Sequence, residues 1–221
     1  MRRFLVGPVH PGTEIELPPG ESRHASKSLR LQTGAKVVLF DGAGAEWDGE
    51  IVQIDGPRVV VRVAAARDVA AVRRFTIAVA VPKGNRLDWM IEKLAELGAA
   101  EILLVRFHRS VAAAGKRPRL ERLAAAGAKQ SGRARIPTIG GAEFKELLER
   151  VNGGCRVASP GAERTLVQAG AELVVIGPEG GLTPDEEREL AARGAERVSL
   201  GSHILRIETA AVAAAAVCAQ L

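Results

Sequence analysis

The segment at residues 173–181, LVVIGPEGG, constrains the fold more than any other part of the sequence. Its first four residues, Leu173–Ile176, are apolar and predict a strand that is covered on both faces. A loop of Gly and Pro follows directly. A helix then begins, with Thr183 as its N-cap and Glu186 completing a capping box. Ligands bind where strands end in open α/β sheets, so this loop is a candidate ligand site.

The charges around this loop narrow the choice of ligand. Phosphate-binding loops combine a Lys with bare backbone amides at a helix N-terminus. This loop has no Lys and lies instead among Glu179, Asp185, Glu186 and Glu187. Acidic side chains repel a phosphate but tolerate a cationic or zwitterionic ligand. The alternative is a tight turn between strand and helix that binds nothing.

Strands and helices alternate from residue 75 onward. The expected strands cover residues 75–81, 102–107, 136–139, 156–158, 173–176 and 197–200, and the expected helices cover 87–97, 118–132, 142–151, 183–193 and 208–220. This alternation predicts an α/β fold with a mostly parallel sheet and helices on both faces. The last helix is rich in Ala and almost entirely apolar, which predicts that it is buried, in part against a second subunit.

Residues 1–72 show a different pattern, of short strands joined by turns. The expected strands cover residues 3–6, 14–17, 36–41, 46–54 and 58–63, with hairpin turns at 41–44 and 55–57 and a short helix within 21–29. This pattern predicts a small β-barrel. Residues 64–71 have neither a clear period nor strong turns and are interpreted as a linker. Two domains are therefore expected, at residues 1–70 and 71–221.

Positive charge is concentrated in one part of the chain. Nine basic residues lie between Arg106 and Arg135, against a single acidic residue, Glu121. A local excess of this size indicates a surface for a polyanion such as nucleic acid. The alternative is a solvated face, but the acids that normally intersperse such a face are missing.

The remaining composition excludes several classes of protein. The two cysteines, Cys155 and Cys218, lie far apart, and no Cys/His cluster has the spacing of a metal site. We therefore expect no metal and a reducing, cytoplasmic location. No signal peptide is recognisable at the start. No apolar run reaches the roughly 18 residues that span a bilayer, so no membrane partner is expected.

Two motifs near the C-terminus resemble a known family. They are residues 176–181 (IGPEGG) and 200–210 (LGSHILRIETA), and weaker matches lie at residues 2–4, 24, 29–31, 83–86, 92–98 and 129–133. Together they resemble the bacterial 16S ribosomal RNA uracil-N3 methyltransferases of the SPOUT superfamily, over the full length of the chain. The sequence departs from that family's pattern at Ser202-His203, where Pro-Arg is usual, and at Ile207, where Thr is usual. These differences put in doubt any substrate role for His203.

The resemblance implies a fold, a cofactor and partners. The N-terminal domain would be PUA-like and help to hold RNA. The C-terminal domain would carry a deep trefoil knot, bind S-adenosylmethionine in the knot loops and form a homodimer. S-adenosylmethionine carries a sulfonium and an ammonium group but no phosphate, which agrees with the acidic loop. The partner would be 16S ribosomal RNA or the small ribosomal subunit.

The resemblance and the charge pattern together give candidate site residues. Cofactor binding is expected from the loop after residue 175 and from the second motif: Ile176, Gly177, Pro178, Glu179, Gly180, Gly181, Leu200, Gly201, Ile204, Leu205, Arg206 and Thr209. RNA binding is expected mainly from basic residues: Arg2, Arg3, Arg23, Lys27, Arg30, Lys83, Arg86, Arg109, Lys116, Arg117, Arg119, Gln130 and Arg133.

Methylation of uracil N3 requires that its proton leave and that the base be accessible. Arg206 is predicted to stabilise negative charge on the uracil oxygens, and Glu179 and His203 are candidates for the base. Alternatively, Arg206 pairs only with Glu208 or the RNA backbone. N3 lies on the Watson–Crick edge, so the target must be unpaired or flipped out. Two other functions stay open: ribose 2'-O methylation of RNA, and RNA binding by an assembly factor that has lost catalysis.

Overall fold

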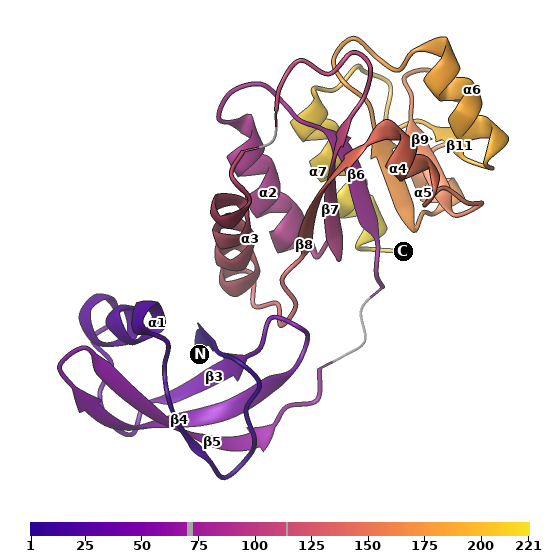
Figure 1. Ribbon diagram of the computed structural model, residues 1–221. Coiled ribbons are helices and arrows are strands. Elements are labelled where there is room, and N and C mark those ends of the chain that lie inside the picture. Colours follow the sequence, from indigo (N-terminus) through magenta and orange to yellow (C-terminus); the bar gives the residue numbers. More distant parts are fainter. Residues whose placement is uncertain (70–72, 114) are drawn as a thin grey trace. The chain divides into compact units, whose positions relative to one another are not determined.

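The computed structural model describes residues 1–69, 73–113 and 115–221, and the chain divides into two compact units (Figure 1). Unit 1 takes its described residues from Met1–Ala71 and Ala128–Ile136, and unit 2 takes its described residues from Val72–Gly127 and Pro137–Leu221. The predicted domain boundary at residues 70 and 71 lies outside the described residues.

Unit 1 is built on a mixed five-stranded sheet. Its strands are β1 (Arg2–Leu5), β2 (Glu14–Glu16), β3 (Lys36–Phe40), β4 (Glu46–Asp55) and β5 (Arg58–Ala66). They lie in the order β1-β3-β4-β5-β2, with β1 and β3 parallel and the other neighbours antiparallel. Alternate residues such as Phe4, Val37, Leu39 and Ile51 point into one core because side chains alternate between the two faces of a strand.

Two local features of unit 1 differ from the prediction. The short helix within residues 21–29 is divided into α1 (Pro19–Arg23) and a π-helical turn, η1 (His24–Ser28). The first three residues of the predicted linker, 64–66, belong instead to β5. They are strand because β4 is long enough to pair with them, with Trp47 opposite Ala66.

Unit 2 is built on a six-stranded sheet in which every neighbouring pair is parallel. Its strands are β6 (Thr76–Ala80), β7 (Glu101–Arg106), β8 (Thr138–Glu143), β9 (Cys155–Ala158), β10 (Leu173–Ile176) and β11 (Glu196–Val198). They lie in the order β11-β9-β10-β6-β7-β8. All four residues of β10 are buried, so the predicted strand with two covered faces is confirmed.

The helices are α2 (Arg86–Leu97), α3 (Arg117–Gln130), α4 (Phe144–Leu148), α5 (Leu166–Ala169), α6 (Pro184–Ala192) and α7 (Ile207–Cys218). Gly98 ends α2 in the left-handed conformation, as predicted. The apolar helix α7 packs against α2, β6 and β10, which explains its burial within a single chain. No helix in the described part of the chain is both long and apolar enough to cross a membrane.

The region around β8 differs most from the prediction. The expected strand at 136–139 is displaced to Thr138–Glu143, and the expected helix at 142–151 shrinks to the five residues of α4. The strand continues because β7 offers partners along its whole length, with Leu103 opposite Gly140 and Leu104 opposite Gly141. The short helix α5, which the sequence analysis missed, has its own capping box between Thr165 and Gln168.

The two cysteines lie buried in unit 2 as free thiols. Burial raises the pKa of Cys155 to about 12 and that of Cys218 to about 11, from an ordinary value of 9.0. The thiolate is the reactive form. We therefore expect both thiols to be inert to a thiol-specific reagent at pH 8 in the folded protein and to react at once in denaturant. Rapid labelling of the native protein would contradict this packing.

Candidate functional site

Three parallel strands end side by side at one edge of the unit 2 sheet. The register pairs Val198 of β11 with Ala158 of β9, and Val175 of β10 with Val157 of β9. The other neighbour of β10 is β6. After β10 the chain continues to β11 at one edge of the sheet, and after β6 it continues to β7 in the opposite direction. Such a reversal is where open parallel sheets form their ligand crevice.

A cavity of about 380 Å³ opens among the loops that follow these strands. Its volume lies within the range of about 300–1,000 Å³ that is typical of small-molecule sites. The described lining comes from the ends of β9 and β10, the loops after β10 and β11, and the first turns of α6 and α7: Val157, Ala158, Ser159, Pro160, Ile176, Gly177, Pro178, Glu179, Gly181, Leu182, Glu187, Leu200, Gly201, His203, Ile204, Leu205, Arg206, Ile207 and Ala210.

The start of α6 fixes the loop on one side of the cavity. The predicted capping box is confirmed: the Thr183 hydroxyl accepts from the backbone N–H of Glu186 (3.2 Å), and Glu186 Oε2 accepts from the backbone N–H of Thr183 (2.8 Å). The other carboxylate oxygen of Glu186 accepts from the backbone N–H of His108 (2.8 Å). Glu186 is buried, and these bonds help to compensate its charge.

Removing the Glu186 side chain should measurably lower the stability of unit 2. Glu186→Ala loses the cap and the bond to His108, and we expect the free energy of unfolding to fall by about 2–4 kcal/mol. Denaturant unfolding of the full chain measures the change. The exposed Glu189 lies on the same helix, so Glu189→Ala is the matched control and should stay within about 0.5 kcal/mol of the original protein. Equal losses of unfolding free energy in the two variants would contradict this stabilising role of Glu186.

The cavity contains most of the predicted cofactor residues. Ile176, Gly177, Pro178, Glu179, Gly181, Leu200, Gly201, Ile204, Leu205 and Arg206 line it. Gly180 and Thr209 are not among the lining residues. Gly180 faces the Arg109 side chain instead, and its carbonyl accepts from Arg109 Nη1 (2.7 Å).

The sequence analysis missed the contribution of β9 to the cavity. Val157 and Ala158 end β9, and Ser159 and Pro160 follow it directly. These residues lie outside both motifs, and β9 is the neighbour of β10 in the sheet. The parallel order of the strands is the signal that locates them, and it cannot be read from either motif alone.

The chemistry of the lining fits S-adenosylmethionine. Two carboxylates, Glu179 and Glu187, can face cationic groups, and no Lys belongs to the described lining. The N-terminus of α7 begins at Ile207 and offers backbone amides to a carboxylate. The apolar side chains from β10 and the later loops suit an adenine ring. Gly201 has φ of 144°, a conformation that other residues rarely adopt, so its loop depends on glycine.

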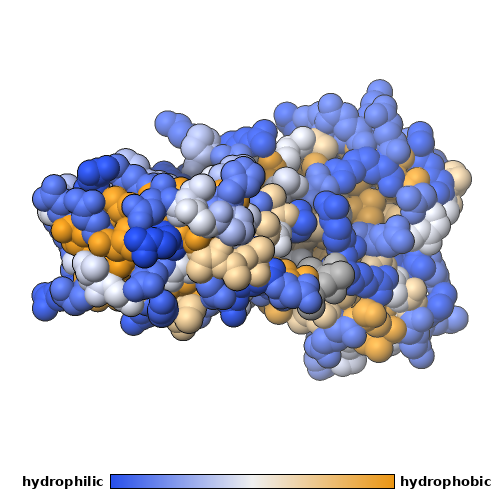
Figure 2. Space-filling view, turned by 90° about the horizontal axis from the view of Figure 1, so that it is seen from below, coloured by the Kyte–Doolittle hydropathy of each residue, from blue (hydrophilic) through white to orange (hydrophobic). Residues whose placement is uncertain are grey.

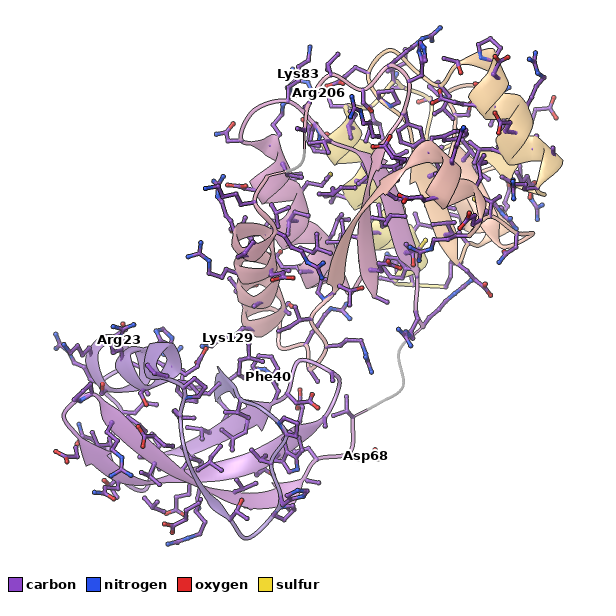
Figure 3. All side chains as sticks on the ribbon, in the orientation of Figure 1. Arg23, Phe40, Asp68, Lys83, Lys129 and Arg206 are labelled. Carbon is purple, nitrogen blue, oxygen red and sulfur yellow. The ribbon has the colours of Figure 1, made fainter. Side chains whose placement is uncertain are left out.

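Arg206 lies at the start of α7, and its contacts bear on one of the two roles considered for it above. It is the N-cap residue of the helix and its side chain is exposed. The carboxylate of Glu208 pairs with Arg86 Nη1 (3.3 Å) and not with Arg206. Pairing of Arg206 with Glu208 is therefore wrong within this chain, and pairing with the RNA backbone stays an alternative. Figure 3 labels Arg206 and Lys83 at the same end of unit 2, and Arg86 Nε donates to the Lys83 carbonyl (3.0 Å).

The predicted RNA-binding residues of unit 1 fall into two groups. Arg2, Arg23, Lys27, Arg30 and Gln130 are exposed, and Arg133 is half-buried. Arg23 lies on α1 in Figure 3, and the neighbouring Arg30 has φ of 50°. Arg3 differs from these, because its side chain is mostly buried, pairs with Glu46 and lies over the Phe40 ring at 5.1 Å. This geometry gives Arg3 a structural role in the sheet.

In unit 2, several predicted RNA-binding residues already have partners. Arg117 pairs with Glu121 (2.8 Å), and Arg119 pairs with Asp88. Arg109 donates to the carbonyls of Gly180 and Leu182. The side chains of Arg117 and Arg119 are exposed, and exposed pairs contribute only about 0–1 kcal/mol, so a phosphate can displace them. Lys83 and Lys116 are also exposed, and Arg86 is half-buried.

Comparison with known proteins decides the family. Residues 70–219 match the model of an RNA methyltransferase domain, and residues 17–64 match that of an RNA methyltransferase PUA domain. Ribosomal RNA small subunit methyltransferase E of Mycobacterium bovis is 34% identical over 214 residues, which cover 88% of this chain and 81% of that protein. The chain belongs to this RNA methyltransferase family. The prediction made from the two C-terminal motifs is therefore confirmed.

Other members of the family support the same assignment. The Bacillus subtilis enzyme of the same name is 29% identical, over 86% of this chain and 83% of that protein. The solved structure of the Neisseria gonorrhoeae enzyme, bound to S-adenosylmethionine, is 27% identical and covers 98% of this chain and 95% of that chain with a TM-score of 0.86. The fold of this family, with a PUA-like mixed sheet and a SPOUT-type parallel sheet, is the fold of the two units.

Proposed function

We propose that this chain transfers a methyl group from S-adenosylmethionine to N3 of a uridine in 16S ribosomal RNA. The observation that carries the proposal is the cavity, whose acidic and apolar lining lies at the carboxyl ends of β9 and β10 and fits this cofactor. Relatives of the same family carry the name of a ribosomal RNA small subunit methyltransferase, and one solved relative contains S-adenosylmethionine.

Different residues of the cavity bind the cofactor and take part in catalysis. Glu179 and Glu187 face the cationic part of the cofactor, and the glycines of the two loops allow its close approach. S-adenosylmethionine supplies the activated methyl group when bound. Arg206 stabilises the negative charge that develops on the uracil oxygens when the N3 proton leaves, and such a donor acts most strongly where water is excluded. Glu179 and His203 both line the cavity and are the candidates to accept that proton.

The organisation of the whole molecule follows from the same proposal. The N-terminal domain, residues 1–70, holds RNA, and residues 71–221 form the catalytic domain with the cofactor in a trefoil knot. Arg2, Arg23, Lys27 and Arg30 bind RNA from the first domain. In the second, Lys83, Arg86, Arg109, Lys116, Arg117 and Arg119 do so, with Gln130 and Arg133 beside them in the chain. The enzyme acts in the cytoplasm as a homodimer.

The dimer is proposed to form on the less buried side of α7. Val212, Ala213, Ala216 and Val217 are only half-buried there, although the helix is almost entirely apolar. Trp89 and Val167 are exposed apolar residues on the nearby elements α2 and α5, both of which contact α7. Figure 2 shows one face of the molecule on which apolar residues gather in patches between hydrophilic ones.

A charge on this side of α7 should prevent dimerisation. Ala213→Glu would bury an unpaired carboxylate in the subunit interface, which is costly. The sedimenting species is therefore expected to change from a dimer to a monomer or to aggregates. The circular dichroism spectrum should stay that of a folded chain. Ala192→Glu, at an exposed position of α6, is the matched control and should leave the dimer intact. A monomeric original protein, or a dimeric Ala213→Glu variant, would refute this interface.

The proposed function is tested by incorporation of a labelled methyl group. Small ribosomal subunits that lack the modification are incubated with the enzyme and labelled S-adenosylmethionine, and label is counted in the 16S RNA. The expected result is about one methyl group for each RNA molecule. Cofactor binding without incorporation would favour an assembly factor that has lost catalysis.

A further inference from the structure

The buried carboxylate of Glu208, which pairs with Arg86, has no role in the function proposed above. Glu208 lies in the first turn of α7, and only 8% of its side chain is exposed. One carboxylate oxygen, Oε1, accepts a bond from Arg86 Nη1 at 3.3 Å. The other oxygen, Oε2, is buried and has no hydrogen-bond partner among the described residues. A buried acceptor without a partner costs about 1–3 kcal/mol, and more when it is charged.

A second Arg–Glu pair in unit 2, between Arg150 and Glu101, forms both of the bonds that such a pair can make. Arg150 donates through both terminal nitrogens to both oxygens of Glu101. This pair lowers the pKa of Glu101 and raises that of Arg150. Arg86 and Glu208 make only one of the two possible bonds, although they are more buried on the carboxylate side. The Nη2 group of Arg86 therefore has no hydrogen-bond partner among the residues that the structure describes.

Arg86 is held by its own chain at two points. Nε donates to the Lys83 carbonyl at 3.0 Å, and Nη1 donates to Glu208. The guanidinium has five N–H groups, so three remain for a ligand. Arg86 is also partly exposed, with 36% of its side chain accessible. Lys83 and Arg206 are exposed cations close to Arg86 and Glu208 in the chain, and Figure 3 labels both at the same end of unit 2.

We propose that Glu208 is a positioning residue that holds the Arg86 guanidinium in place, with its open edge directed at a backbone phosphate of the RNA substrate. This inference rests on the proposed function, because it concerns the same substrate. A fixed guanidinium fork binds a phosphate through two parallel bonds, which a freely rotating side chain achieves less often. If the other edge of the guanidinium serves the RNA, the pair needs only the one bond that it makes here, from Arg86 Nη1 to Glu208 Oε1.

A purely structural reading of Glu208 makes a different prediction. A carboxylate in the first turn of a helix favours the helix dipole without any help from Arg86. Asp at this position would keep that effect but is one methylene shorter, so it would not reach Arg86. Glu208→Asp therefore separates the two roles. Arg86→Lys keeps the positive charge but loses the planar fork.

The experiment is a double-mutant cycle read out as RNA affinity, without turnover. The original protein, Glu208→Asp, Arg86→Lys and the double variant are titrated with unmodified 16S ribosomal RNA at several salt concentrations. We expect each single variant to bind about tenfold more weakly, the equivalent of one charge-assisted hydrogen bond. The double variant should bind no more weakly than Arg86→Lys alone, because Glu208 acts through Arg86.

Three further measurements exclude a structural effect. Glu208→Asp should retain the affinity for S-adenosylmethionine and the circular dichroism spectrum of the original folded protein. Its slope of log affinity against log salt should become shallower by about 0.7, the contribution of one single-strand phosphate contact. Glu101→Gln weakens the comparison pair, whose carboxylate lies at the start of β7, and should leave RNA affinity unchanged.

The outcomes separate this inference from the proposed function. Equal RNA affinity for Glu208→Asp and the original protein, or losses that add to about a hundredfold in the double variant, would overturn the inference even if methyl transfer is normal. A coupled cycle in an enzyme that transfers no methyl group would support the inference and overturn the proposed function. An original protein that does not bind the RNA would overturn both.

Discussion

A chain carrying Gly201→Val is expected to lose most of its affinity for S-adenosylmethionine while it remains folded. Gly201 lines the cavity, and its φ of 144° lies in a region that residues with a side chain rarely adopt. Forcing Val into such a conformation costs about 1–3 kcal/mol, which corresponds to a loss of roughly 5- to 150-fold in affinity if the loop moves to relieve the strain. Isothermal titration calorimetry measures the change directly.

A matched glycine provides the control for this prediction. Gly56 forms the turn between β4 and β5, has φ of 55°, and like Gly201 has open space where a Cβ would be added. Gly56→Val should lose a similar amount of stability but bind the cofactor normally, because Gly56 does not line the cavity. Normal affinity in Gly201→Val, measured on folded protein, would show that this loop does not contact the cofactor.

Replacing Arg206 with Ala is expected to slow catalysis more than any other single change at the site. Arg206 lines the cavity, is exposed, and makes no ion pair with Glu208. Loss of one donor that stabilises developing negative charge typically lowers kcat roughly 100- to 1,000-fold. Steady-state kinetics with small subunits as substrate should show this loss in kcat, with a smaller change in KM for the RNA.

The pattern of kinetic constants separates the two roles considered for Arg206. If Arg206 only holds the RNA backbone, Arg206→Ala will raise KM and leave kcat nearly unchanged. Arg188→Ala serves as the control because Arg188 is exposed on α6 and pairs with the equally exposed Asp185 of the same helix. That variant should retain both constants. An unchanged kcat in Arg206→Ala would remove Arg206 from the chemical step.

The features that the sequence predicts well are those fixed by neighbours in the chain. Four apolar residues before a Gly/Pro loop suffice to predict the buried strand β10, and Thr183 with Glu186 suffices for the start of α6. Both patterns depend on interactions within a few residues. The two C-terminal motifs add the family and, through it, most of the residues that line the cavity.

The features that the sequence does not predict depend on contacts between distant segments. Gly140 and Gly141 lie between the expected strand at 136–139 and the expected helix at 142–151, but they belong to β8 because β7 pairs with them. Ser159 and Pro160 reach the cavity only because β9 lies beside β10. Gly180 belongs to a glycine loop whose other residues line the cavity, yet its own neighbour is Arg109, seventy-one residues away in the chain.

Nucleoside mass spectrometry of the methylated RNA tests the proposed reaction most directly. Unmodified 16S RNA in small subunits is incubated with the enzyme and S-adenosylmethionine carrying a deuterated methyl group, then digested to nucleosides. The proposed function predicts a single labelled product, a uridine methylated at N3 of the base, and the Arg206→Ala variant should form it slowly. Label on a ribose 2'-oxygen, or on a base other than uracil, would contradict the proposal.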